Sequence, residues 1–106
     1  MRTKFQLWVE SKKKELEKVH IKMEHVRHKN PDESSIPDPS TGVIYESECC
    51  LGQVTVWESR QMEYEVVNIA TGEMILWEYI ERLPAEPDFN EILEKFFLVL
   101  QRGLKP

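Results

Sequence analysis

Few of the residues that mark common functional classes occur in this sequence. It has only four glycines, too scattered for a glycine-rich phosphate-binding loop. Its two cysteines, Cys49 and Cys50, are adjacent, and adjacent cysteines rarely form a disulfide because the bridge strains the peptide between them. No apolar run approaches the roughly 20 residues that span a bilayer, and no signal-type apolar stretch follows the N-terminus. We therefore expect a cytoplasmic protein with no disulfide framework and no membrane partner.

The usual signatures of metal binding and catalysis are also missing. On a strand His20 and His28 share one face and His25 takes the other, and on a helix the three do not converge either. The sequence contains no HExxH motif and no CxxC pair. Cys50 lacks a local base that would activate its thiol, and carboxylates along exposed strands form no dry pocket. We therefore predict no metal, no cofactor and no enzymatic activity.

Charge is distributed unevenly along the chain. Residues 1–29 carry nine Lys/Arg and four Glu, whereas residues 30–106 carry five Lys/Arg and fifteen Asp/Glu, so +5 and −10 give the net charge of −5. An acidic surface repels phosphate and attracts cationic partners. The balance favours a protein partner and argues against nucleic acid.

The first part of the chain predicts a helix, a strand and a loop. Thr3 and Gln6 have the spacing of a capping box, and apolar residues at 3–4 spacing predict a helix over about 3–18. Alternation of apolar and polar residues favours a strand over 19–27, although the helical spacing of some of the same residues leaves a helix open. Prolines, serines and aspartates predict a loop over 29–42.

The second part predicts strands within 43–81 and a helix over about 88–102. Short turns at 59–61 and 70–72, the second with Gly72 in the left-handed conformation, require antiparallel pairing. Asp88 has the position of a helix cap and Gly103 that of a helix end. The prediction is a single α+β domain over 1–106, an antiparallel meander of about four strands with the N- and C-terminal helices on one face.

Alternation along the strands sorts their side chains into two sets. The set that we expect beneath the helices comprises Thr55, Trp57, Tyr64, Val66, Ile75, Trp77 and Tyr79. The set that we expect to face outward comprises Val54, Val56, Glu58, Glu63, Glu65, Leu76 and Glu78. The outward set is either a solvated sheet surface or a docking surface. For the second case the predicted partner-binding residues are Val56, Glu58, Glu63, Glu65, Leu76 and Glu78. Tryptophans at 8, 57 and 77 fit the core or an interface.

The strand region resembles a family of bacterial immunity proteins. Gly-Gln-Val-Thr-Val-Trp-Glu at residues 52–58, followed by the strand and hairpin at 62–72, is similar to the TriTu-type immunity proteins of polymorphic and contact-dependent toxin systems. The resemblance implies a cytosolic protein that binds and neutralises a cognate toxin domain from a sibling cell. We expect a monomer in a one-to-one complex, and the acidic charge suits a basic toxin such as a nuclease. The alternatives are a small acidic secretion-type chaperone or another protein-binding adaptor, and a small enzyme.

Overall fold

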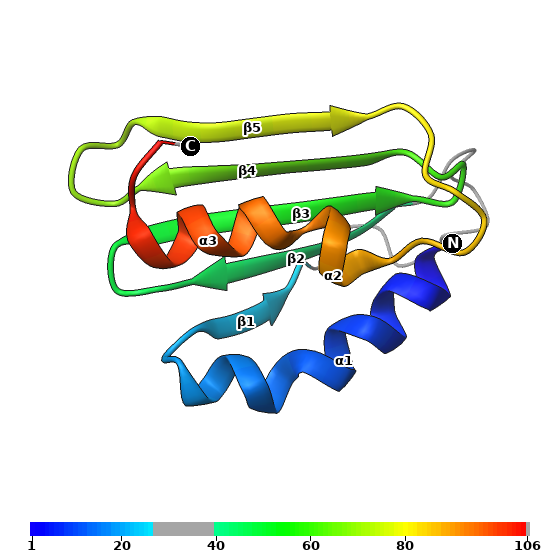
Figure 1. Ribbon diagram of the computed structural model, residues 1–106, viewed down its shortest axis with the longest axis horizontal. Coiled ribbons are helices and arrows are strands. Elements are labelled where there is room, and N and C mark those ends of the chain that lie inside the picture. The colour runs from blue at the N-terminus through cyan, green and yellow to red at the C-terminus, as the bar shows by residue number, and fades with distance from the viewer. Residues whose placement is uncertain (27–39, 106) are drawn as a thin grey trace.

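The computed structural model describes residues 1–26 and 40–105 and contains a five-stranded sheet with helices on one side (Figure 1). The elements in chain order are α1 (Arg2–Lys18), β1 (Lys22–His25), β2 (Ser40–Glu46), β3 (Cys50–Trp57), β4 (Met62–Asn68), β5 (Met74–Ile80), α2 (Phe89–Ile92) and α3 (Glu94–Arg102).

Each strand pairs antiparallel with the next, in the order β1-β2-β3-β4-β5. The α+β class, the antiparallel meander and the packing of the terminal helices on one face are confirmed (Figure 1). The sheet has five strands where about four were predicted, and the strand favoured over 19–27 is present as β1, which pairs with β2 at the edge of the sheet.

A left-handed residue ends α1 and turns the chain into β1. His20 has φ of 62°, its N–H donates to the Glu17 carbonyl at 3.1 Å, and the Ile21 N–H donates to the Leu16 carbonyl at 2.9 Å. These two bonds define a Schellman motif, in which a hydrophobic residue commonly follows the left-handed position. Ile21 is that residue and is buried. The chain therefore leaves the helix at Val19, and β1 is shorter than the strand predicted over 19–27.

Two boundaries in the first half differ from the sequence prediction. Helix α1 begins at Arg2 with Met1 as its cap and no side-chain cap bond, so the predicted capping box of Thr3 and Gln6 is wrong. The predicted loop at 29–42 falls on residues 29–39 that lie outside the described ranges, but Ser40, Thr41 and Gly42 belong to β2. They are strand because they pair with the end of β3, from Ser40 opposite Trp57 to Gly42 opposite Thr55.

Turn and cap residues occupy the conformations expected from their chemistry. Gly72 has φ of 72° in the β4–β5 hairpin, where the Asn68 side chain accepts hydrogen bonds from the Ala70 and Thr71 N–H groups. Asp88 caps α2 by accepting from the Asn90 and Glu91 N–H groups, and Gly103 ends α3 with φ of 72°. The single helix predicted over 88–102 is divided into α2 and α3 at Leu93.

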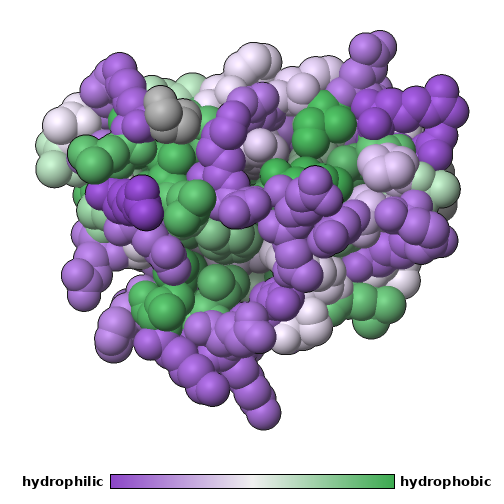
Figure 2. Space-filling view, in the orientation of Figure 1, coloured by the Kyte–Doolittle hydropathy of each residue, from purple (hydrophilic) through white to green (hydrophobic). Residues whose placement is uncertain are grey.

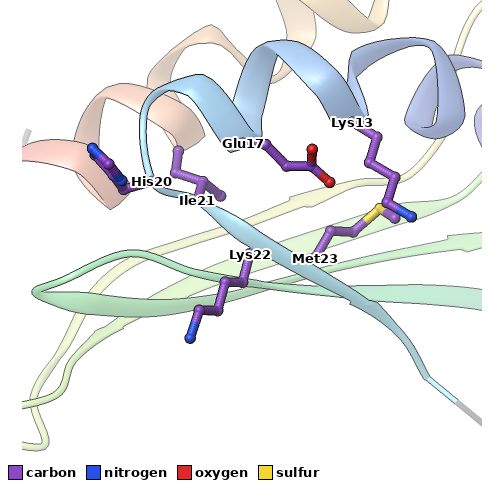
Figure 3. A pocket seen from close by; sticks show the side chains of 6 residues that line it. All are labelled: Lys13, Glu17, His20, Ile21, Lys22 and Met23. Carbon is purple, nitrogen blue, oxygen red and sulfur yellow. The ribbon is translucent and has the colours of Figure 1, made fainter.

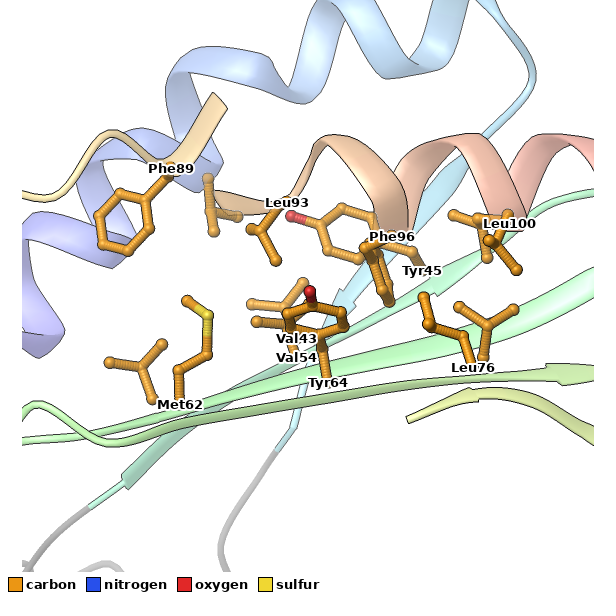
Figure 4. Close-up of a cluster of buried hydrophobic side chains, with 14 of the residues drawn as sticks. Val43, Tyr45, Val54, Met62, Tyr64, Leu76, Phe89, Leu93, Phe96 and Leu100 are labelled. Carbon is orange, nitrogen blue, oxygen red and sulfur yellow. The ribbon is translucent and has the colours of Figure 1, made fainter. Parts of the chain in front are cut away.

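The core lies between the helices and the sheet, and rings at its centre determine where α3 packs (Figure 4). Phe96 makes edge-to-face contacts with Tyr45 of β2, Tyr64 of β4 and Phe97, with ring centroids 5.0–5.8 Å apart. It lies directly over Gly52 of β3, where an added Cβ would come within 2.6 Å of the Phe96 Cζ atom. The absent side chain at position 52 thus leaves the space that the Phe96 ring occupies.

We predict that Gly52→Ala lowers the free energy of unfolding by about 1–3 kcal/mol, the usual cost of overpacking a filled core. Chemical denaturation measures the loss. Thr55→Ala, on the same strand but outside the core, is the control and should change stability by less than about 0.5 kcal/mol. The Phe96→Leu change should recover part of the Gly52→Ala loss in the double variant. Equal, small effects of Gly52→Ala and Thr55→Ala would contradict the close approach.

Candidate functional site

The register of the strands divides the sheet into a face covered by helices and a face without them, which we call the open face. Val54, Tyr64 and Glu78 stand in one cross-strand row, and the next row contains Thr55, Glu63 and Tyr79. Residues of the first row lie toward the helices, as the burial of Val54 and Tyr64 shows. Because side chains alternate along a strand, the second row lies on the open face. Glu65 on that face has Gln53 and Trp77 as its neighbours.

The sequence assigned several side chains to the wrong face. Val54 and Val56 have no exposed surface and Leu76 is 6% exposed, so these aliphatic residues belong to the core. The expected inward position is also wrong for four other residues, because the register places them on the open face: Thr55, Trp57, Trp77 and Tyr79. Tyr64 and Val66 lie under the helices as expected, and Glu63 and Glu65 face outward as expected.

Two of the predicted partner-binding carboxylates are engaged within the chain. Glu58, at the start of the β3–β4 hairpin, accepts from the N-terminal amine at 2.7 Å and from Arg2 Nε at 3.0 Å. Hydrogen bonds from these two cations lower the pKa of the Glu58 carboxyl. Glu78 lies beside Tyr64 on the helix-covered side and accepts from Lys95 Nζ of α3 at 3.2 Å. Both carboxylates thus tie helical segments to the sheet.

The other two predicted carboxylates lie in the middle of the open face. Glu63 and Glu65, both half-buried, are on β4 between β3 and β5. Within residues 1–26 and 40–105 neither side chain forms an ion pair. Their cross-strand neighbours on β3 are Gln53 and Thr55, which are uncharged. Among the described residues, therefore, no cation neutralises these two carboxylates.

Exposed aromatic side chains stand beside these carboxylates. Trp77 is 55% exposed and lies directly across from Glu65, and Tyr79 is 43% exposed and lies directly across from Glu63. Sequence reasoning placed both residues in the set expected beneath the helices, although it left an interface role open for Trp77. The signal that would have found them is the length of the β4–β5 hairpin, because the predicted loop at 70–72 already pairs residue 65 with residue 77.

The helix-covered side has a different surface character. Figure 2 shows that side, where hydrophilic side chains surround separate hydrophobic areas. A cavity of about 490 Å³ opens next to the α1–β1 turn and is lined by Lys13, Glu17, His20, Ile21, Lys22 and Met23. Lys22 points away from the group formed by Lys13, Glu17 and Met23 in Figure 3. The charged side chains therefore do not converge as one set, since Lys22 lies apart from Lys13 and Glu17.

The described histidines are separate. The His25 Nε2 atom lies 3.0 Å from Glu10 Oε1 on α1, whereas His20 occupies the left-handed position after that helix. His28 lies outside the described residues. Among the residues that the structure describes, no group of three His, Cys, Asp or Glu side chains is arranged to hold a metal ion. The same part of the chain contains no helix long and apolar enough to cross a membrane.

The cysteines lie at the junction of β3 and the end of α3. Cys50 is fully buried, and its Sγ atom is 3.9 Å from the Val99 carbonyl oxygen. Burial, followed by the neighbouring Cys49 thiol, raises the pKa of Cys50 to about 11. Cys49 is partly exposed and contacts the Leu100 and Gln101 carbonyl oxygens. A thiol that is buried and protonated at neutral pH is a poor nucleophile, and the surroundings of Cys50 fit a packing role.

Comparison with known proteins finds one family over almost the whole chain. The family model described as immunity protein TriTu matches residues 3–99, from the first turn of α1 to the last turns of α3. No curated protein matches the sequence.

We predict that Cys50 resists alkylation in the folded protein. Treatment with iodoacetamide at pH 8 followed by mass spectrometry should modify the Cys49→Ser variant fully in denaturant and hardly at all under native conditions, because the remaining thiol is buried with a pKa of about 11. Unmutated protein supplies the comparison, since it also carries the partly exposed Cys49. Rapid native labelling of Cys50 would contradict its assignment to the core.

Proposed function

This chain belongs to the TriTu family of immunity proteins, and on that premise we propose that it binds a cognate toxin domain and neutralises it by covering a surface that the toxin needs. The open face supports this proposal best. It combines exposed aromatic side chains, Trp77 and Tyr79, with the carboxylates of Glu63 and Glu65. Tryptophan and tyrosine are enriched at the energetic centres of interfaces, and charged neighbours supply orientation and association rate.

The finer parts of the proposal concern the toxin and the setting. We propose a one-to-one complex of a monomeric immunity protein in the cytoplasm, with no nucleic acid and no membrane involved, within a contact-dependent or polymorphic toxin system. The net charge of −5 favours a basic toxin, because opposite charge steers encounter. A nuclease is such a toxin, since its cleft must attract phosphate. The basic side chains in the cleft of such a nuclease then provide a target for the acidic open face.

The proposed activity is binding without catalysis. At the cavity beside the α1–β1 turn Lys22 points away from Lys13, Glu17 and Met23, and the two thiols lie against main-chain carbonyl groups of α3. Binding requires only a complementary surface, and the open face offers one without rearrangement of the core.

We predict that the double charge reversal Glu63→Lys/Glu65→Lys weakens protection. Like charges placed against a basic toxin cost several kcal/mol, so the dissociation constant should rise about a hundredfold or more. The measurement is survival of cells that co-express the variant with the toxin domain from the neighbouring gene, with calorimetry on the purified pair.

The matched control is Glu17→Lys/Glu86→Lys, which changes the net charge equally at exposed positions on α1 and in the β5–α2 connection. This control should lose no more than a few-fold in affinity, because long-range charge effects are screened at physiological salt. Equal protection by the two double variants would argue against the open face as the docking surface.

A further inference from the structure

The arrangement of carboxylates and aromatic rings on the open face has a repeat along the strand direction. Glu65 lies opposite Trp77, and two residues along the strands Glu63 lies opposite Tyr79. Each pair places a carboxylate and a ring on adjacent strands, where opposing Cβ atoms are about 4.5–5.5 Å apart. Positions two apart on a strand are separated by about 6.5–7 Å. The open face thus carries two equivalent carboxylate–aromatic pairs side by side.

Carboxylates elsewhere on the same strands and hairpins already have a cation from this chain. Glu58 binds the N-terminal amine and Arg2, Glu73 binds Lys105, and Glu78 binds Lys95. Glu63 and Glu65 have no such cation within the described residues. Of the carboxylates on β4, β5 and the two hairpins that flank β4, only these two lack a cation among the described residues, and both stand opposite exposed aromatic rings. That coincidence indicates a surface which an external cation completes.

Resting on the proposed function, we infer that the toxin docks on the open face through an extended segment carrying two arginines separated by one residue. Each guanidinium stacks on one ring and pairs with the carboxylate opposite it, Trp77 with Glu65 and Tyr79 with Glu63. Arginine fits better than lysine because its planar group stacks on aromatic faces and binds carboxylate in two-pronged geometry. An extended segment presents every second side chain on one side at the same spacing of about 6.5–7 Å.

The negative charge of the open face favours a basic segment as its occupant over a second copy of this chain, a nucleic acid or an anionic lipid surface. A second copy of this chain would bring an identical acidic face against the first, so a two-fold interface would place four unneutralised carboxylates together. A nucleic acid or an anionic lipid surface would meet the same repulsion through its phosphates. The aromatic rings provide apolar area to bury, and the carboxylates select a cationic partner.

The test uses the full chain labelled with ¹⁵N and a five-residue peptide, acetyl-Thr-Arg-Thr-Arg-Thr-amide, as the probe. Titration followed by NMR should shift the Trp77 indole N–H resonance and backbone signals of β4 and β5. The matched peptide with citrulline for both arginines keeps the planar shape but has a carbonyl oxygen in place of one NH2 group and lacks charge, so it should bind at least tenfold more weakly. A peptide of equal charge with adjacent arginines, acetyl-Thr-Thr-Arg-Arg-Thr-amide, should bind severalfold more weakly because its side chains point to opposite sides.

Variants of the chain separate the proposed contacts from general attraction. Trp77→Leu and Glu65→Gln should each reduce affinity for the alternating arginine peptide about five- to tenfold. Glu78→Gln removes the same charge from β5 on the helix-covered side, where Lys95 neutralises it, and should change affinity less than twofold. Retained dispersion of the amide spectrum shows that each variant is folded.

Equal binding of the arginine and citrulline peptides, or shifts confined to α1 and α3, would overturn the inference. So would concentration-dependent broadening of the Trp77 signal without peptide, which would identify a second copy as the occupant. Protection of toxin-producing cells is measured separately. If peptide binding fails while protection stands, the arginine site is wrong and the proposed function survives; if the peptide binds as described and no protection occurs, the proposed function fails.

Discussion

The contact between Phe96 and Gly52 is the constraint on which the rest of the arrangement depends. The ring occupies the space that a side chain at position 52 would fill, and it touches aromatic rings from β2 and β4 at the same time. Through this contact α3 lies close against the middle of the sheet (Figure 1), and α1 packs against α2 through Phe5 and Phe89 and against α3 through Trp8 and Phe97. All the helices are thereby committed to one face. The other face keeps its side chains available to a partner.

Element types and their order followed from the sequence, but the two faces of the sheet did not. Periodicity identified both terminal helices and hairpin turns identified the strands within 43–81, whereas of the two predicted N-terminal caps only Asp88 was correct. The left-handed His20 that ends α1 has no strong sequence signal. The face assignment failed because tryptophan and tyrosine were expected in the core. The turn predicted at 59–61 already pairs residue 58 with residue 62, which puts Val56 and Tyr64 on one face. Hairpin length was therefore better evidence for side-chain direction than hydrophobicity.

The surface was predicted only in part, for a related physical reason. Glu63 and Glu65 were identified because an unpaired carboxylate is too costly to bury. Val56 and Leu76 were wrongly placed beside them: these residues are near the two glutamates in the sequence, but their side chains are buried on the opposite face of the sheet. Glu58 and Glu78 were chosen for their charge, but charge alone does not reveal a cation from a distant helix, such as Arg2 or Lys95. Only the folded chain distinguishes the carboxylates that pair with a cation of this chain from those that have none among the described residues.

The central claim is that a toxin covers the open face of the sheet, and hydroxyl-radical footprinting of the complex tests it most directly. Oxidation rates of exposed side chains are compared with and without the toxin bound. Trp77 and Tyr79, 55% and 43% exposed in the free chain, should become strongly protected, while Leu98 on α3, 42% exposed, should keep its rate. Protection of Leu98 with unchanged oxidation of Trp77 and Tyr79 would place the toxin on the helices and contradict the account.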